Sequence, residues 1–342
     1  MQYHYTMHVK IIAECGVNHN GSLYIAKKMI DQASMIGADY VKFQSFKASE
    51  LASEKLKKAN YQNSKSNNKE SQFEMLKKLE ISEDFHNKII KYSFKKKIKF
   101  LSSPFDITSF NMLTKLGIKT FKIASGEINN YPLLLEVSKK SKEVILSTGM
   151  ANYTEISNAL KILLSHKLKR ENITILQCTS DYPTKYKDVN LRVMNDFKKK
   201  FNTNIGLSDH TLGIEVAVAA TALGASIIEK HFTLNKKMQG PDHFISADPK
   251  EFRNMVNSIR NVEIALGSKT KTLSKSELKI KKIVRKSIIA KEDILKGDAF
   301  SLHNLTSQRI GGGIELNYFK TLLNKKSKTN YKKGQKILKC EI

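Results

Sequence analysis

The 342-residue sequence predicts an α/β protein, a (β/α)8 TIM barrel followed by a small C-terminal domain. Two observations predict the barrel. Short runs rich in β-branched residues alternate with longer amphipathic runs, the pattern of parallel strands joined by helices. This alternation repeats eight times, and eight units over about 250 residues is the size of a TIM barrel. A doubly wound open sheet would show the same alternation and stays open as an alternative.

The predicted strands are short and apolar at most positions, as expected of strands that are covered on both faces. They are Val9–Glu14, Tyr40–Gln44, Ile98–Ser102, Thr120–Ile123, Val144–Ser147, Ile173–Gln177, Asn204–Leu207 and Ile227–Lys230. Each is followed by a run with helical spacing of its apolar residues. These runs are Leu23–Ile36, Ser82–Lys96, Ile107–Leu116, Tyr131–Ser141, Tyr153–Ser165, Leu191–Lys200, Gly213–Leu223 and Pro249–Leu266.

Two segments break this rhythm. Lys47–Gln72 is rich in Ser, Asn and Lys, and a connection of that length is usually a functional lid or disordered. Residues 267–282 are polar and cationic, which predicts a linker between a barrel domain (1–266) and a small domain (283–342). The small domain should contain a strand at Ser287–Ala290, and its core would be marginal alone, so we expect it to dock elsewhere.

The composition is strongly basic: 59 Lys and Arg against 32 Asp and Glu give a net charge of +27. Such a balance is compatible with nucleic-acid binding, with an anionic substrate or with a lysine-rich surface. A hydrophobic content of 40% excludes a disordered basic tail protein. No nucleic-acid-binding module is recognisable, and much of the surplus lies in segments such as 94–99, 198–200 and 325–333. We therefore interpret most of the charge as solvated surface and do not expect nucleic acid as the main partner.

The sequence also favours a cytoplasmic protein without a membrane segment. Cys15, Cys178 and Cys340 lie far apart and form neither a metal motif nor an even disulfide set, which indicates a reducing compartment. The N-terminus lacks the apolar core of a signal peptide. The longest apolar-rich stretch, 214–228, is too short to span a bilayer.

Polar residues follow every predicted strand at its carboxyl end, where barrel enzymes build their active sites. Buried strands rarely end so uniformly in charged and hydrogen-bonding groups unless these face a polar ligand. The residues, in chain order, are Glu14, Lys42, Gln44, Ser103, Lys122, Ser125, Glu127, Ser147, Thr148, Thr179, Ser180, Tyr182, Asp209, His210, Glu229 and His231.

Within this set, two pairs are chemically informative. His210 and His231 are one βα unit apart, so their imidazoles could share a metal ion, with Mn²⁺ or Mg²⁺ favoured over zinc. They could equally be hydrogen-bonding residues at the barrel rim. Lys42 and Lys122 predict a phosphate or carboxylate cradle with Ser103, Ser125 and Ser147. The alternative is a pair of structural ion pairs with carboxylates.

The carboxylates allow several roles. Glu14 and Glu127 could be acid–base groups or could balance the lysines, and the sequence does not choose between these. Asp242 follows the eighth strand on a Gly-Pro turn, where it could line the site or form the turn. Cys15 and Cys178 are more simply explained as small packing residues than as nucleophiles.

Together these residues resemble a known family. The segments IIAECGVNHNGSLYIAKKMI, VKFQSFKA, SSPFD, FKIASGEINNYPLL, ILSTGMA, CTSDYPT, IGLSDHT, EKHFTL and GPDHFIS occur in the order seen in bacterial sialic acid synthases. These are the N-acetylneuraminate synthases and the similar N,N′-diacetyllegionaminate synthases. The tail VRKSIIAKEDILKGDAFSLHNL resembles the antifreeze-like (SAF) domain that ends those enzymes. The resemblance covers nearly the whole chain.

The resemblance implies a reaction and a site. Phosphoenolpyruvate adds through C3 to the aldehyde of an N-acetylated mannosamine-type sugar, water attacks C2, and phosphate leaves with C–O cleavage. By motif, His210 and His231 would bind the divalent metal, and Glu14 would assist water addition or stabilise the cationic intermediate. Phosphoenolpyruvate would be held by Lys42, Lys122, Ser125 and Ser147, and the sugar by Gln44, Tyr182 and Asp242.

The resemblance further implies a homodimer in which the SAF domain covers the partner's barrel. An arginine of that domain contacts the N-acetyl group, and the matching residue here is Arg309. The usual pattern Lys-Arg-Pro is Gln308-Arg309-Ile310 in this chain, which leaves the loop's placement and the choice of sugar open. Relatives also commonly have Leu-Glu at Ala247-Asp248, a change from which we expect little catalytic effect.

The acceptor sugar is the main open question. We place N-acetylmannosamine first and 2,4-diacetamido-2,4,6-trideoxymannose, the legionaminate precursor, as the alternative. The two sugars differ at C4 and C6, and residues 49–62 are a candidate segment for sensing those positions. A Schiff-base aldolase using Lys42 or Lys122 with pyruvate remains a second enzymatic alternative.

Overall fold

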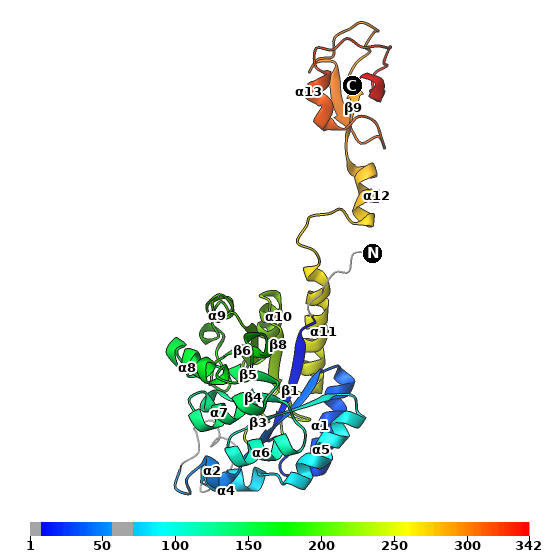
Figure 1. Ribbon diagram of the computed structural model, residues 1–342. Coiled ribbons are helices and arrows are strands. Elements are labelled where there is room, and N and C mark those ends of the chain that lie inside the picture. The colour runs from blue at the N-terminus through cyan, green and yellow to red at the C-terminus, as the bar shows by residue number, and fades with distance from the viewer. Residues whose placement is uncertain (1–7, 57–70, 342) are drawn as a thin grey trace. The chain divides into compact units, whose positions relative to one another are not determined.

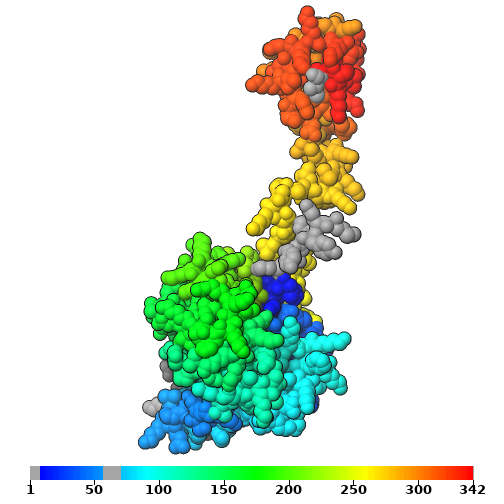
Figure 2. Space-filling view, in the orientation of Figure 1, coloured from blue at the N-terminus to red at the C-terminus, as the bar shows by residue number. Residues whose placement is uncertain are grey.

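The structure is a computed structural model that describes residues 8–56 and 71–341. The chain forms two compact units, Met1–Gly267 and Ser268–Ile342, each with a hydrophobic core of its own. Figure 1 shows the strands and helices of each unit. In the space-filling view the first unit is a closely packed body (Figure 2).

Unit 1 contains eight parallel strands in one sheet. They are β1 (Lys10–Gly16), β2 (Tyr40–Ser45), β3 (Lys99–Pro104), β4 (Thr120–Ile123), β5 (Glu143–Ser147), β6 (Ile173–Cys178), β7 (Asn204–Asp209) and β8 (Ile227–His231). The order is β3-β2-β1-β8-β7-β6-β5-β4, so the first strand pairs with the last. β3 and β4 lie next to each other but share no hydrogen-bonded ladder. The sheet is therefore a nearly closed TIM-type barrel, and the doubly wound alternative does not apply.

Helices cover the outside of this sheet (Figure 1). They are α1 (Leu23–Ile36), α5 (Glu83–Lys95), α6 (Ile107–Lys115), α7 (Tyr131–Lys140), α8 (Tyr153–Leu163), α9 (Val193–Phe201), α10 (Glu215–Ala222) and α11 (Pro249–Leu266). Two shorter helices, α2 (Ala48–Leu51) and α4 (Gln72–Leu79), pack on residues that follow the ends of β2 and β3. Most of these helices begin at a side-chain cap. The Asp248 carboxylate, for example, accepts hydrogen bonds from the backbone of Lys250 and Glu251 at the start of α11. Asp248 thus caps the first turn of α11.

The barrel interior changes from apolar to polar along the strands. Near the amino ends, the interior is filled by an apolar layer: Ile12, Tyr40, Leu101, Ile145, Leu176 and Ile227. Side chains alternate between faces of a strand, so residues two positions further along point into the same interior. Those residues are Glu14, Lys42, Ser103, Ser147, Cys178 and Glu229. The apolar layer closes one end, and the polar layer above it faces the carboxyl ends.

Unit 2 is smaller and has no βα repeat. It comprises α12 (Lys275–Val284), the antiparallel strands β9 (Ser287–Ala290) and β10 (Leu305–Gln308), and α13 (Phe319–Leu322). Its core includes Ile288, Ile294, Phe300, Leu305 and Tyr331. Short 3-10 turns complete the described chain at Ser125–Glu127 (η1), Arg170–Asn172 (η2), Tyr186–Asp188 (η3), Leu316–Tyr318 (η4) and Lys339–Glu341 (η5).

The structure agrees with the predicted strands and the eight main helices to within a few residues. Four shorter helices of the described part of the chain, α2, α4, α12 and α13, were not predicted. α2 lies inside the expected lid segment, of which residues 57–70 are outside the described part. α4 begins at the last residue of that segment, Gln72, and α12 begins in the expected linker. No helix in the described part of the chain is long and apolar enough to cross a membrane.

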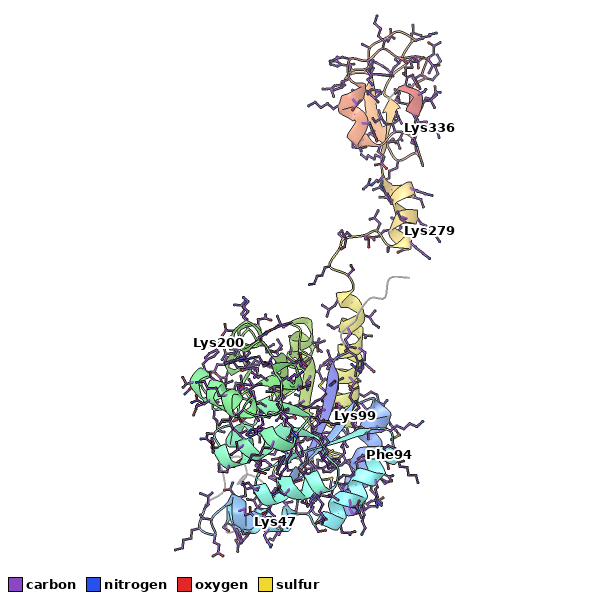
Figure 3. The ribbon with its side chains drawn as sticks, viewed as in Figure 1. Lys47, Phe94, Lys99, Lys200, Lys279 and Lys336 are labelled. Atoms are coloured by element: carbon purple, nitrogen blue, oxygen red, sulfur yellow. The ribbon has the colours of Figure 1, made fainter. Side chains whose placement is uncertain are left out.

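The lysine-rich segments lie at the surface, as the composition predicted. Lys99, Lys200, Lys279 and Lys336 are exposed, and their side chains are labelled in Figure 3. Phe94, on the outer face of α5, is 86% exposed. These residues lie on helix faces, in loops or, for Lys99, at the amino end of β3, away from the polar interior, so the net charge of +27 is largely a surface property.

Candidate active site

A cavity of about 520 Å³ opens at the carboxyl ends of the barrel strands, entirely within unit 1. Eleven of the predicted site residues line it: Glu14, Lys42, Gln44, Ser103, Lys122, Ser125, Ser147, Tyr182, His210, His231 and Asp242. They come from all eight strands or the turns directly after them. A barrel that places such residues around one space has the usual architecture of a barrel enzyme.

Two lysines and two glutamates form an ionic cluster at the base of the cavity, and all four are at most 5% exposed. The Lys42 ammonium lies 2.8 Å from Glu14 and 3.6 Å from Glu229, and the Lys122 ammonium lies 3.2 Å from Glu229. Lys42 also donates to Ser103 at 3.2 Å. Because each cation has an anion beside it, burial is tolerated before any ligand binds.

The charges in this cluster shift one another's protonation. Burial by itself would raise the pKa of Glu229, but Lys122 and Lys42 lower it to about 2. Burial opposes the charge on Lys42, yet Glu14 and Glu229 raise its pKa. Burial lowers the pKa of Lys122 and raises that of Glu14. Glu229 is therefore the fixed anion of the cluster, and Glu14 is the carboxylate more easily protonated.

An imidazole pair forms another side of the cavity. The rings of His210 and His231 have centroids 5.5 Å apart, and Tyr182 packs against His210 at 4.2 Å. His210 uses Nδ1 to contact the Thr179 carbonyl at 2.7 Å, which leaves its Nε2 directed elsewhere. His231 Nδ1 is buried without a hydrogen-bond partner in the described residues and lies 3.9 Å from Asp242.

Burial and the neighbouring His210 lower the pKa of His231 well below its ordinary value. Burial, with a smaller effect of Glu14, raises the pKa of Asp242 to about 7. His231 is thus a neutral imidazole with an unused nitrogen. Ser147 Oγ is also buried without a hydrogen-bond partner among the described residues. Buried polar atoms without partners are costly, so both atoms are suited to contact a bound ligand.

The serine side of the cavity depends on a glycine. The backbone NH of Gly149 donates to Ser125 Oγ at 2.9 Å. A Cβ at this position would lie 2.2 Å from Ser180 Oγ and 2.8 Å from Ser125 Oγ. Glycine therefore allows β4, β5 and β6 to place their hydroxyl groups around one point.

The opposite side of the cavity, near β1, β2 and β3, is apolar. We call it the apolar wall; it consists of Val17, Leu51, Met75, Leu76, Leu79 and Phe105. Leu51 belongs to α2, and the next three residues of the wall belong to α4. Neither helix was predicted from the sequence, and neither was this wall.

Two predicted site residues are not among those that line the cavity. Glu127, in η1, accepts a hydrogen bond from Asn130 at 2.7 Å. Of the two ion pairs considered as the alternative, to Glu14 and to Glu127, the first is present between Lys42 and Glu14. The second is wrong, because Lys122 pairs with Glu229. Arg309 is an exposed residue of unit 2, directly after β10.

Sequence reasoning had named Glu229 only as a polar strand-end residue and missed its role as the anion of both lysines. It also treated Cys178 as a packing residue. Cys178 lines the cavity, 3.8 Å from His210 Nδ1, and although burial would raise the pKa of its thiol, His210 lowers it to about 7. Strand alternation could have placed Glu229 in the site, since Glu229 precedes His231 by two residues and so lies on the same face of the strand.

The fold and this site define a TIM-barrel protein whose polar cavity combines buried cations with an imidazole pair. The chain belongs to the NeuB family, whose model matches residues 29–271. It is 50% identical to the N,N′-diacetyllegionaminic acid synthase of Campylobacter jejuni over 327 residues, 96% of this chain and 98% of that protein. It is 38% identical to human N-acetylneuraminate-9-phosphate synthase, over 86% of this chain and 82% of that protein.

A solved structure supports the same assignment. The N-acetylneuraminic acid synthetase of Leptospira borgpetersenii, in complex with citrate, matches 80% of this chain and 90% of its own with a TM-score of 0.70 and 36% identity.

Proposed function

We propose that this protein condenses phosphoenolpyruvate with 2,4-diacetamido-2,4,6-trideoxymannose to form N,N′-diacetyllegionaminate and phosphate. From the sequence we expected N-acetylmannosamine first and this sugar second. The comparisons favour the second, because the relative at 50% identity is an N,N′-diacetyllegionaminic acid synthase, whereas the human N-acetylneuraminate-9-phosphate synthase is 38% identical. N-acetylmannosamine remains the second candidate acceptor.

The observation that carries the proposal is the pair of buried lysines, Lys42 and Lys122, at the base of a cavity lined by serine hydroxyls. Phosphoenolpyruvate is a small, multiply charged anion, and fixed ammonium groups with hydroxyl donors suit its phosphate and carboxylate. We assign this binding to Lys42, Lys122, Ser125 and Ser147, the last with its unpaired hydroxyl. Ser103 orients Lys42 through their hydrogen bond.

The reaction forms one C–C bond and breaks one C–O bond. C3 of phosphoenolpyruvate attacks the sugar aldehyde, whose oxygen becomes an alkoxide and takes up a proton. The C2 cation that results is attacked by water, and Glu14 accepts the water proton. Phosphate then leaves from C2 as the ketone forms. Holding both reactants in one cavity supplies much of the acceleration, because the addition becomes effectively intramolecular.

The imidazole pair could supply two of the ligands of a divalent cation. His231 Nδ1 has no hydrogen-bond partner among the described residues, and His210 Nδ1 contacts the Thr179 carbonyl, so His210 Nε2 has only a 3.5 Å contact with Ser208 Oγ. In residues 8–56 and 71–341 no group of three or more His, Cys, Asp or Glu could hold a metal ion. We propose that His210 and His231 hold Mn²⁺ or Mg²⁺ with oxygen ligands from water or substrate. The cation would polarise the aldehyde as a Lewis acid.

The sugar would contact Gln44, Tyr182 and Asp242, which line the cavity around the imidazole pair. We extend the proposal to unit 2, as an SAF domain that covers the barrel of a second subunit in a homodimer and supplies Arg309 to the N-acetyl group. The retained arginine in Gln308-Arg309-Ile310 and the separate core of unit 2 support this extension. Glu127 is left out, since it does not line the cavity.

The test is phosphate release by the purified protein with phosphoenolpyruvate and each sugar in parallel, with and without Mn²⁺ after chelation. We expect metal-dependent release, faster with the diacetamido sugar. No release with either sugar would refute the synthase. Borohydride inactivation that requires pyruvate would instead identify the Schiff-base aldolase.

A further inference from the structure

The two sides of the cavity differ in chemistry. Strands β4 to β8 contribute hydroxyl, thiol and imidazole groups, whereas the apolar wall presents aliphatic and aromatic side chains. A polyanion such as phosphoenolpyruvate gains nothing from an apolar surface and belongs with the lysines. The apolar wall is therefore available to the other substrate.

The apolar wall is held firmly to the barrel. Glu80, at the end of α4, accepts hydrogen bonds from the Lys47 ammonium and the Ala48 backbone NH, both at 3.0 Å. The backbone NH of Lys47 donates to Asp106, the N-cap of α6, at 2.8 Å. Met75 and Leu79 are buried and pack on Phe46, directly after β2. Helices α2 and α4 are thus tied to the ends of β2 and β3, and the surface is preformed.

The position of the apolar wall along the barrel indicates which part of a sugar it meets. The ionic cluster consists of residues within strands, namely Glu14, Lys42, Lys122 and Glu229. All six residues of the wall come after the ends of β1, β2 or β3, and so lie further toward the mouth. The aldehyde carbon C1 must meet the base of the cavity, where phosphoenolpyruvate is held. C2 adjoins C1, so C4 to C6 are the atoms directed toward the mouth.

We propose that the apolar wall binds the C4–C6 end of the acceptor and selects a sugar with a C4 acetamido group and a C6 methyl group. This inference rests on the proposed function. Burying two methyl groups against this surface is favourable. N-acetylmannosamine has hydroxyl groups at C4 and C6, and these would lose water there without gaining a hydrogen bond.

The test compares kcat/KM for the two sugars in three variants. Leu76→Gln makes the partly buried centre of the apolar wall polar at similar size. Leu76→Met keeps it apolar, and Met150→Gln makes the same change in polarity on the opposite side of the cavity. For Leu76→Gln we expect the preference for the diacetamido sugar to fall about tenfold, the effect of a few apolar atoms in a pocket. The preference should stay within about twofold of the original value in the other two variants.

The outcomes separate this inference from the proposed function. If neither sugar supports phosphate release by the unmodified protein, the proposed function fails. If Leu76→Gln lowers kcat/KM equally for both sugars, or changes neither, the protein remains a synthase but the apolar wall does not select the sugar. Equal melting temperatures of the three variants would exclude misfolding as the cause of a changed preference.

Discussion

Glu229 is the residue on which the ionic cluster depends, because it is the anion of both Lys42 and Lys122. Removing one partner of a buried ion pair typically costs about 3–5 kcal/mol, since the remaining charge is left uncompensated. We expect Glu229→Gln to lower the melting temperature markedly without ligand. Phosphoenolpyruvate should then raise it more than in the unmodified protein, because its negative charge replaces the missing carboxylate.

The control for this prediction is Ser208→Ala, which removes a 3.0 Å hydrogen bond to Glu229 but keeps its charge. That variant should show the ordinary response to phosphoenolpyruvate. Thermal unfolding with and without the ligand measures both effects. An equal shift in the Glu229→Gln and unmodified proteins would argue against direct contact between the ligand and the lysines.

His231 leads to a prediction about metal binding. Its unpaired Nδ1 makes it the stronger candidate ligand of the imidazole pair, since the nitrogen has no other partner in the described residues. We expect His231→Ala to weaken Mn²⁺ binding at least tenfold, as measured by calorimetric titration, and to abolish phosphate release. His166→Ala, an exposed histidine outside the cavity, should change neither. Unchanged Mn²⁺ affinity in His231→Ala would remove it from the ligand set.

The residues of the site were predictable where strand alternation holds. Glu14, Lys42, Ser103 and Ser147 lie on the inward faces that the predicted strands assign to them. Alternation ends where the strand ends. Glu127 follows β4 within the 3-10 turn η1 and bonds locally to Asn130, a direction that no strand periodicity specifies.

At the level of elements, the turn after β1 and the segment after β8 are joined by a buried amide. Asn18 Nδ2 donates to the Phe232 carbonyl and to Ser246 Oγ, both at 2.9 Å, and Ser246 donates to the Asp242 carbonyl at 2.6 Å. Asn18 therefore fixes the backbone beside His231 relative to that of Asp242. The run NHNG of the sequence has this structural role.

We expect Asn18→Ala to lower kcat with a smaller effect on the KM for phosphoenolpyruvate, because Asp242 and His231 lie on the sugar and metal side. Two lost hydrogen bonds correspond to about 2–3 kcal/mol, mostly of stability. Steady-state kinetics and thermal unfolding measure both quantities. Asn20→Ala is the matched control: it removes a bond from Nδ2 to the Gln239 carbonyl and a 3.4 Å contact of Oδ1 with His243 Nε2, but neither of the bonds that Asn18 makes to Phe232 and Ser246. Equal kinetics in both variants would show that Asn18 does not position the site.

The helices α4 and α12 were not predicted because the prediction relied on the spacing of apolar residues and did not use helix-capping patterns. α4 and α12 lie in or directly after polar, lysine-rich segments and are short, so they were not recognised as helices. Both nevertheless begin with a capping box, Ser71 with Glu74 and Ser274 with Glu277. A search for the pattern Ser-x-x-Glu would have located both starts. The apolar wall depends on tertiary contacts of α4 with Phe46 and Phe105, which local sequence does not specify.

At the scale of the whole molecule, the chain has two units with separate cores. In the proposed function, unit 2 of one subunit contributes Arg309 to the active site in unit 1 of the other subunit. We expect Arg309→Ala to raise the KM for the sugar about tenfold and to leave that for phosphoenolpyruvate nearly unchanged, since the loss of a charge-assisted hydrogen bond costs about 1.5–3 kcal/mol. The exposed Arg285, which pairs with Glu315 in the same unit, provides the control Arg285→Ala. Equal kinetics for Arg309→Ala and the unmodified protein would contradict a contact with the sugar.

The stability of unit 1 should depend on pH through its buried histidines. Burial lowers the pKa of His19 to about 4, with a further lowering by His86 and His243, and burial lowers the pKa of His243 to about 4 as well. The unfolded chain takes up these protons near pH 6.5, whereas the folded chain resists them. Stability is therefore complete above pH 6.5 and falls as the pH drops toward 4, by about 3 kcal/mol for His19 and by less for His243, whose charge is more strongly screened by solvent.

His19→Asn tests this account. His19 Nδ1 accepts a hydrogen bond from the backbone NH of Gly21 at 3.0 Å, and the amide oxygen of asparagine can accept the same bond. Unlike histidine, the asparagine side chain does not take up a proton in this pH range. We expect the variant to lose less stability between pH 7 and pH 5 than the unmodified protein, in denaturant titrations at each pH. His303→Asn changes an exposed residue of unit 2 and should leave the pH profile as it is. A profile for His19→Asn as steep as the original would mean that the acid sensitivity between pH 7 and pH 5 arises from another group, such as His243.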